Sequence, residues 1–290
     1  MAKKIRIITD TGADNLDQLV ALGVDYVPLY ITFDGENYIK QMVDISIEEF
    51  YQKISEEHTF HPKTSLPSVT DYIDMFNKHL ADDEDIIYIA LDSKFSGSYQ
   101  ASLTARDIIL EENKDARIEI IDSLAVTYAQ FALVREAATM ANNGSTVDEI
   151  VERINMMIPT VRVFLTVENL DSLKESGRVS NISAALAGVL NIKPIMKLED
   201  GVLEATSKVK GINKALSKII SDTKDYLGDN IDKYKIAIVH ANCEQDAINY
   251  SLSVKEELGI EEIEFCSLGV CIGLHAGPTL LGIALVQDKF

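Results

Sequence analysis

Two hydroxyl groups and a glycine, Ser96-Gly97-Ser98, stand where an apolar segment ends and a helical pattern begins. The segment before them, residues 85–91, is rich in β-branched and aromatic residues, which predicts a strand buried on both faces. Apolar residues recur at helical spacing after them, so Ser98 or a neighbour is the predicted N-cap. The free amides of a helix start, beside a glycine that lets a ligand approach closely, are typical of an anion site. The same pattern also describes a turn and cap without a ligand.

A second interpretation makes Ser96 the nucleophile of a small serine hydrolase and His275 its base. His275 lies in a glycine-rich segment, residues 273–278, for which we expect a turn. The sequence around Ser96 lacks the glycine two places earlier that a nucleophile elbow uses. His275 could instead donate a hydrogen bond to a bound anion or be a structural loop residue.

Three other patterns invite comparison with known sites. Asp10-Thr11-Gly12 has the aspartic-protease form, but that chemistry needs a second carboxylate, and the sequence has no second Asp-Thr-Gly or Asp-Ser-Gly. His58 and His61 stand three residues apart, yet no Cys or Asp cluster completes a metal site, so a solvated loop is favoured. No glycine-rich phosphate loop is present. We therefore expect no metal and no cofactor.

The charge of the chain is large and unevenly distributed. The net charge is −19, which argues against a nucleic-acid partner because phosphate neutralisation needs a basic face. Residues 174–218 nevertheless carry +4, against −23 for the remainder. Such a basic segment is either a solvated face or the place where an anionic group or an acidic partner docks.

We expect a cytoplasmic protein without stable membrane insertion. No apolar run approaches the roughly eighteen residues of a membrane span, and the first residues lead into a short strand rather than a signal-peptide core. The three cysteines contain no Cys-x-x-Cys pair and are predicted to be buried thiols in a reducing compartment.

The first half of the chain alternates short apolar segments with helical patterns. Strands are predicted at residues 5–9, 26–31, 85–91 and 118–122. Such alternation predicts right-handed crossovers and a mainly parallel sheet. Ligands collect at the carboxyl ends of parallel strands, where the turns after Thr9, Leu91 and Asp122 belong. Residues 64–68 are predicted to be a polar loop.

The pattern changes near residue 158, where we place the boundary between a first domain, residues 1–158, and a smaller second domain, residues 159–290. A strand at 161–167 is followed by a hairpin with an Asp200-Gly201 turn. Further helices are predicted at 212–226 and 244–258, and further strands at 235–239, near 263 and at 280–286. The fold class is therefore α/β, a mainly parallel domain followed by an antiparallel one, with a cleft between them. Residues 182–190, small and apolar, are either buried core or the wall of a pocket for a chain-like ligand.

Taken together, these segments resemble the DegV family, bacterial fatty-acid-binding proteins that include the lipid-carrying subunits of fatty acid kinase. The resemblance spans nearly the whole chain. It rests on residues 8–11 with 14–16, 64–68, 95–100, 121–123, 176–180, 192–195 and 273–278. Two positions depart from the family pattern: Thr279 replaces a glycine, and residues 208–211 lack an arginine.

The resemblance implies a carrier rather than an enzyme. A long-chain fatty acid lies between the two domains, with its carboxylate held by Thr64 and Ser96 and with Ser65 and Ser98 in the same two motifs. His275 is expected near the head group. Arg178 is expected there too, on the surface that faces the partner or the phosphoryl group. The partner implied is a separate fatty acid kinase, which phosphorylates the bound acid to an acyl phosphate for phospholipid metabolism.

Simple energetics agree with such a ligand. Burial of about fourteen methylenes contributes roughly 11 kcal/mol, against an association cost of about 4 to 15 kcal/mol. A carboxylate leaves water at low cost only where hydroxyls and amides replace its solvent shell. A carrier of another anionic lipid would share Thr64 and Ser96 and differ in the pocket wall near residues 184–190.

Overall fold

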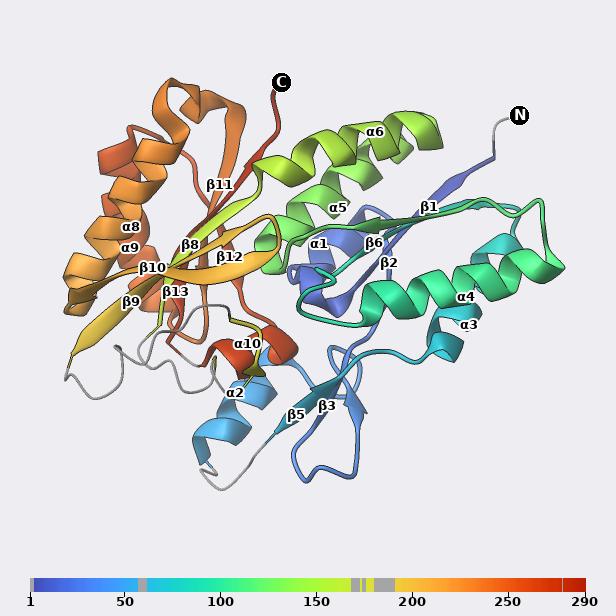
Figure 1. Ribbon diagram of the computed structural model, residues 1–290, viewed down its shortest axis with the longest axis horizontal. Helices are drawn as coiled ribbons and strands as arrows, with labels where there is room; N and C mark the ends of the chain where they lie inside the picture. The colour runs from blue at the N-terminus through green and yellow to red at the C-terminus, as the bar shows by residue number, and fades with distance from the viewer. Residues whose placement is uncertain (1–2, 57–61, 168–172, 174–175, 180–190, 278) are drawn as a thin grey trace.

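The computed structural model describes residues 3–56, 62–167, 173, 176–179, 191–277 and 279–290. Two sheets dominate the molecule, and a smaller third sheet lies below them with α2 (Ile47–Glu56) and α10 (Val270–Ala276) (Figure 1). The predicted apolar segment at 182–190 and the histidines at 58 and 61 lie outside the described residues.

The first sheet is parallel and buried on both faces. Its strands are β1 (Ile5–Asp10), β2 (Asp25–Val27), β6 (Asp85–Ala90) and β7 (Ile118–Asp122), in the order β2-β1-β6-β7. Successive side chains of a strand point to opposite faces. Ile86 and Tyr88 accordingly pack towards α3 (Val69–Leu80) and α4 (Ser98–Glu112), whereas Ile87 and Ile89 belong to the cluster that contains α5 (Thr127–Asn142). The short α1 (Leu16–Ala21) contacts α5.

The strand predicted at 26–31 is divided between two sheets. After β2, Pro28 has no amide hydrogen for a ladder, and the amide of Leu29 donates to the Thr11 hydroxyl instead, at 3.0 Å. The chain then enters β3 (Tyr30–Thr32), which pairs antiparallel with β4 (Ile39–Lys40) and β5 (Lys63–Ser65). The loop predicted at 64–68 is thus partly a strand, because its first residues pair with β3, more than thirty residues earlier in the chain.

The second sheet is mainly antiparallel. Its order is β10-β9-β8-β13-β11-β12, and β11 with β12 is the parallel pair. The strands are β8 (Arg162–Thr166), β9 (Ile192–Glu199), β10 (Val202–Lys210), β11 (Tyr234–His240), β12 (Glu264–Ser267) and β13 (Leu281–Gln287). One face packs against α8 (Ile212–Leu227) and α9 (Glu244–Leu258). The Asp200-Gly201 turn is confirmed, with positive φ at both residues.

Helix α5 lies between the two sheets (Figure 1) and contacts β1 and β6 on one side and β11 and β13 on the other. Small side chains such as Ala129 and Ala137 let both sheets approach it, and one hydrophobic cluster joins the two halves of the chain. The predicted fold class is confirmed. The expected boundary at 158 falls between α6 (Val147–Met157) and β8 and stays a prediction. In the described part of the chain, no helix has the length and apolarity to cross a membrane.

The β9–β10 turn packs against the segment that follows β6, and this contact predicts the cost of a side chain at Gly201. Its φ is +71°, and a Cβ there would lie 2.8 Å from Oδ2 of the buried Asp92. Gly201→Ala should therefore lower the free energy of unfolding by about 2 to 4 kcal/mol, from backbone strain plus overpacking. Gly35→Ala, with φ +83° and open space around the added methyl, should cost only about 1 kcal/mol. Urea unfolding of both variants measures the difference, and equal losses would contradict the contact.

Candidate functional site

A cavity of about 260 Å³ lies between the two sheets at the N-terminal end of α5. Most of its wall is apolar and comes from both halves of the chain. The apolar lining residues are Leu29, Leu66, Leu91, Phe95, Val126, Val163, Leu165, Leu173, Leu198, Leu203, Val239, Leu268, Cys271, Ile272, Ala276 and Leu280. Such a wall suits an apolar ligand, because it offers dispersion contacts and few hydrogen-bonding partners.

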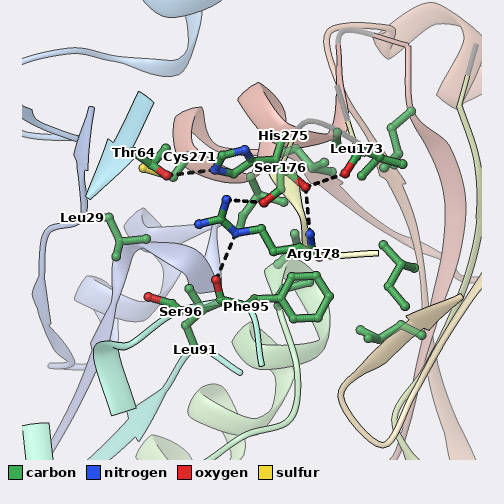
Figure 2. Close-up of a pocket in the computed structure, with 18 of the residues that line it drawn as sticks. Leu29, Thr64, Leu91, Phe95, Ser96, Leu173, Ser176, Arg178, Cys271 and His275 are labelled. Atoms are coloured by element: carbon green, nitrogen blue, oxygen red, sulfur yellow. Dashed lines mark hydrogen bonds between the residues drawn. The ribbon is translucent and has the colours of Figure 1, made fainter. Parts of the chain in front are cut away.

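Few of the lining residues are polar, and most of these lie close together. The polar lining residues are Thr64, Ser65, Ser96, Thr127, Ser176, Arg178 and His275. Figure 2 shows Arg178 between His275 and Phe95, with Thr64 beside His275 and Ser96 beside Phe95. The structure therefore brings together four residues singled out in the sequence, Thr64, Ser96, Arg178 and His275, which come from four separate segments of the chain.

Thr64 and His275 meet although 211 residues separate them. Thr64 Oγ1 lies 2.8 Å from His275 Nε2, and one of the two donates according to the imidazole tautomer. The turn expected at 273–278 is wrong for most of that segment, because α10 extends to Ala276 and carries His275 in its last turn. Residues from the first half of the chain hold this helix.

Two side chains from the first half of the chain accept hydrogen bonds from backbone amides at the start of α10, and no local sequence pattern predicts them. Asp14 Oδ1 accepts from the Gly269 amide at 2.9 Å, and Gln41 Oε1 accepts from the Cys271 amide at 3.2 Å. Helix starts leave amides without intrahelical partners, so these acceptors stabilise the helix. They also fix where His275 projects.

Ser96 and Ser98 occupy different positions. Gly97 is the N-cap of α4, and Ser98 is its first residue, so the predicted helix start is confirmed with the neighbour as cap. Ser96 lines the cavity, and its Oγ accepts from the Ser98 amide at 3.2 Å and lies 2.8 Å from Ser98 Oγ. Ser98 is fully buried behind it and does not line the cavity. Ser65 lines the cavity beside Thr64.

Arg178 turns its side chain into the cavity. Its Nε donates to the Phe95 carbonyl at 3.2 Å, and one terminal nitrogen donates to the Ser176 carbonyl at 2.8 Å. The bond to Phe95 joins the two halves of the chain, and the two bonds together leave further guanidinium hydrogens for a ligand, since the group has five. The sequence placed Arg178 near the head group, on a partner-facing surface. In the structure its side chain lines the same cavity as Thr64, Ser96 and His275, and its role towards a partner stays a prediction.

The electrostatics of the polar end favour an anion. Burial, together with the charge of Arg178, lowers the pKa of His275 to about 4. The imidazole is therefore neutral near neutral pH, and Arg178 supplies the fixed positive charge. A carboxylate there would meet one guanidinium and several neutral donors.

Two lining residues were not anticipated from the sequence. Ser176 Oγ accepts from the Arg178 amide at 3.2 Å and donates to the Leu173 carbonyl at 2.7 Å, which shapes the Arg178 turn. Thr127 begins α5 with φ +54°, an uncommon conformation for a β-branched residue. No sequence signal marks Thr127, while Ser176 belongs to the motif that contains Arg178.

Comparison with known proteins gives the family. A family model described as an uncharacterised protein of the DegV family matches residues 4–288. The chain belongs to the DegV family. A DegV domain-containing protein of Caldanaerobacter subterraneus subsp. tengcongensis is 36% identical over 282 residues, which cover 97% of this chain and 98% of that protein. A DegV domain-containing protein of Clostridium perfringens is 31% identical over 289 residues, 99% of this chain and 98% of that protein.

Solved structures of similar fold carry fatty acids. A stearic-acid-binding protein of Eubacterium ventriosum is 28% identical with a TM-score of 0.91, covering 99% of this chain and 98% of that chain. A DegV family protein of Ruminococcus gnavus with vaccenic acid is 25% identical, with a TM-score of 0.85 and coverage of 98% and 100%. One of Eubacterium eligens loaded with heptadecanoic acid is 25% identical, with a TM-score of 0.80 and coverage of 99% and 100%.

The DegV site gives no geometric support to the hydrolase alternative. The hydrogen-bonding partner of His275 Nε2 is Thr64, and Ser96 Oγ contacts Ser98. A serine nucleophile needs a base within hydrogen-bond reach. In the described part of the chain, no group of three or more His, Cys, Asp or Glu side chains could hold a metal ion.

The lowered pKa of His275 predicts a pH effect on stability. Between about pH 6.5 and about pH 4 the unfolded chain takes up a proton on His275 that the folded protein does not, so this residue makes the free energy of unfolding fall as the pH falls. His275→Asn should remove that contribution. Between about pH 7 and about pH 5 the wild type should therefore lose about 2 kcal/mol more of its free energy of unfolding than the variant does.

Urea unfolding of the wild type and of His275→Asn at the two pH values measures this difference in the free energy of unfolding. Thr64→Val is the matched control, because it removes the hydrogen-bond partner and keeps the imidazole; it should retain the wild-type pH dependence. A His275→Asn protein with the wild-type pH dependence would show that His275 titrates normally.

Proposed function

We propose that this DegV protein binds a long-chain fatty acid, with its acyl chain along the apolar wall and its carboxylate at the polar end. The observation that carries the proposal is the cavity itself, apolar over most of its lining with Thr64, Ser96, His275 and Arg178 gathered together. Fatty acids named in the similar structures from three other bacteria support the ligand class. The two halves, residues 1–158 and 159–290, are proposed as the domains between which the acid lies.

The polar residues have different proposed roles in holding a carboxylate. Thr64 and Ser96 are the proposed direct hydroxyl contacts, with Ser65 beside them. His275 positions Thr64 through their 2.8 Å contact, and Ser98 positions Ser96. Arg178 is proposed to attract the carboxylate, because its charge faces the cavity. Mostly neutral donors hold the ligand less tightly than several ion pairs would, which suits a protein that must release it.

We further propose that the bound acid is presented to a separate fatty acid kinase, and that the protein itself performs no chemistry. A kinase needs access to the carboxylate, and the anionic phosphates of its ATP favour a basic docking face. Lys208 and Lys210 are exposed on the edge strand β10, within the basic segment of an otherwise acidic chain. These lysines are the proposed contact.

The ligand can be identified in the purified protein. Solvent extraction and mass spectrometry of the wild-type protein should give a fatty acid in about one copy per chain, and the Thr64→Ala/Ser96→Ala double variant should lose most of it, because the carboxylate then lacks its hydroxyl donors. Ser55→Ala/Thr139→Ala, which removes two exposed helix hydroxyls, should retain it.

Two outcomes would overturn parts of this proposal. A folded wild-type protein that neither contains nor takes up fatty acid would overturn the function. Equal retention by the Thr64/Ser96 variant would overturn the head-group assignment alone. Hydrolysis of a p-nitrophenyl ester that disappears in Ser96→Ala would favour the hydrolase alternative.

The kinase contact is testable by charge reversal. Lys208→Glu/Lys210→Glu should lower acyl-phosphate formation with a fatty acid kinase by about tenfold while leaving lipid content unchanged, because rim charges govern encounter more than ligand binding. Lys114→Glu, an exposed lysine near α4 and distant in sequence from the basic segment, is the control and should have little effect. Unchanged coupling in the double variant would overturn the docking assignment.

A further inference from the structure

The polar residues that line the cavity differ in how deeply they are buried. The half-buried ones, which form the polar end, are Thr64, Ser65, Ser96, Ser176, Arg178 and His275. Thr127 is only 4% exposed and is thus as buried as Val163, Leu198 and Val239 of the apolar wall. Thr127 therefore places a hydroxyl group in the closed part of the cavity, where the proposed function puts the acyl chain.

The hydroxyl of Thr127 also differs from the polar end in its hydrogen bonding. Every polar side chain of that end already bonds to another residue, Ser65 through its 3.3 Å bond to the Leu66 carbonyl. In the described part of the chain, the Thr127 hydroxyl has no such partner. A buried hydroxyl without a hydrogen bond is costly, so Thr127 favours a ligand that brings a polar group to this depth.

The surrounding packing fixes the Thr127 side chain at the cavity wall. Val126, the residue before it, packs against Leu29, Leu91 and Cys271. Tyr128, the residue after it, is fully buried. A β-branched side chain has few χ1 rotamers, so the hydroxyl has little freedom to turn towards another partner.

The start of α5 adds hydrogen-bond donors at the same place. The helix is 16 residues long, and Val126 at its N-cap supplies no side-chain cap. The first amides of a helix have no intrahelical acceptor and point beyond its N-terminal end, which carries the positive end of the helix dipole. Val126 and Thr127 both line the cavity, so this end faces it. An oxygen atom beside Thr127 therefore meets a hydroxyl and the positive end of a helix.

A neutral hydroxyl group on the acyl chain matches this place better than water or a second charge does. Water in a buried cavity is held by two to four polar partners, whereas a hydroxyl on the chain is also held by burial of the methylenes on either side of it. A charged group would need a cation, and Arg178, the one cation of the described lining, lies at the polar end. A hydroxyl can either donate to Thr127 Oγ1 or accept from it.

We propose that Thr127 makes this protein selective for a long-chain fatty acid that carries one hydroxyl group on its buried chain. The inference rests on the proposed function, since it takes a fatty acid with its carboxylate at the polar end, and it names the substrate class. Thr127 is the specificity-determining residue. The preferred position of the hydroxyl along the chain is set by the path from the polar end to the start of α5.

The selectivity has two physical parts. An unsubstituted acid covers Thr127 with methylenes and leaves its hydroxyl unpaired. An acid whose hydroxyl lies against the apolar wall loses a hydrogen bond to water and gains none. One neutral hydrogen bond corresponds to about tenfold in affinity. The correctly placed isomer should therefore bind about tenfold more tightly than the unsubstituted acid, and the other isomers should bind less tightly than it.

Competition for the delipidated full chain measures this selectivity. The ligands are octadecanoic acid and a series of monohydroxyoctadecanoic acids in which the hydroxyl moves along the chain one carbon at a time, delivered together from cyclodextrin at equal concentrations. Extraction of the protein, followed by chromatography and mass spectrometry, gives the amount of each acid bound. The wild type should enrich one isomer, or two neighbouring ones, about tenfold over octadecanoic acid.

Substitutions at Thr127 separate the hydroxyl from the shape of the side chain. Thr127→Val keeps the β-branched shape and should abolish the enrichment while binding octadecanoic acid more tightly, because no hydroxyl is then buried against the chain. Thr127→Ala should abolish it too, and covers the case in which Thr127→Val does not fold. Thr127→Ser should enrich the same isomer as wild type. Thr104→Val removes an exposed hydroxyl that bonds the Gln100 carbonyl, and should enrich that isomer as well.

The outcomes separate this inference from the proposed function. A wild type that binds octadecanoic acid and enriches no isomer would overturn the inference and leave the carrier function standing. Enrichment that persists in both Thr127→Val and Thr127→Ala would place the ligand hydroxyl elsewhere and overturn it as well. A folded wild-type protein that takes up none of these acids would overturn the proposed function, and the inference with it.

Discussion

The burial of α5 between the two sheets is the constraint on which the rest of the structure depends. A helix with its side chains is about 10 to 12 Å across, so α5 fixes the separation of the sheets along its length. Where the helix begins, at Val126 and Thr127, the same space continues without backbone to fill it, and that space is the cavity. The small residues of α5 therefore decide both how the halves join and how wide the cavity is.

Within that space, the cost of burying polar groups explains why they are gathered. Each buried donor or acceptor needs a partner, and the structure supplies them in pairs: Thr64 with His275, Ser96 with Ser98, and Arg178 with two backbone carbonyls. Pairing at one end leaves the remaining wall apolar. A molecule with a long hydrocarbon chain and one anionic end matches this division, and the neutral His275 beside a charged Arg178 keeps the positive charge localised.

The cavity also lies where hydrogen bonds connect distant parts of the chain. Asp14 and Gln41 hold the start of α10, Tyr51 donates to the Leu268 carbonyl just before it, and the end of α10 carries His275 to Thr64. A change in any of these contacts would shift α10 and with it the contact between His275 and Thr64. Ligand binding and the packing of the second half on the first are for this reason expected to stabilise each other.

The sequence by itself determined the elements whose signals are local. The strand before Ser96, the helix start at Gly97, the Asp200-Gly201 hairpin and the alternation that gives a parallel sheet all follow from residue type and spacing within a few turns. The seven motifs likewise indicated the family and named Thr64, Ser96, Arg178 and His275. Only the tertiary structure decided what depends on distant partners. Pro28 divides a predicted strand, β5 forms because β3 pairs with it, and α10 replaces a predicted turn because Asp14 and Gln41 supply its missing acceptors. It also set the Arg178 side chain between His275 and Phe95, since side-chain direction in a packed core follows neighbours that the sequence does not place side by side.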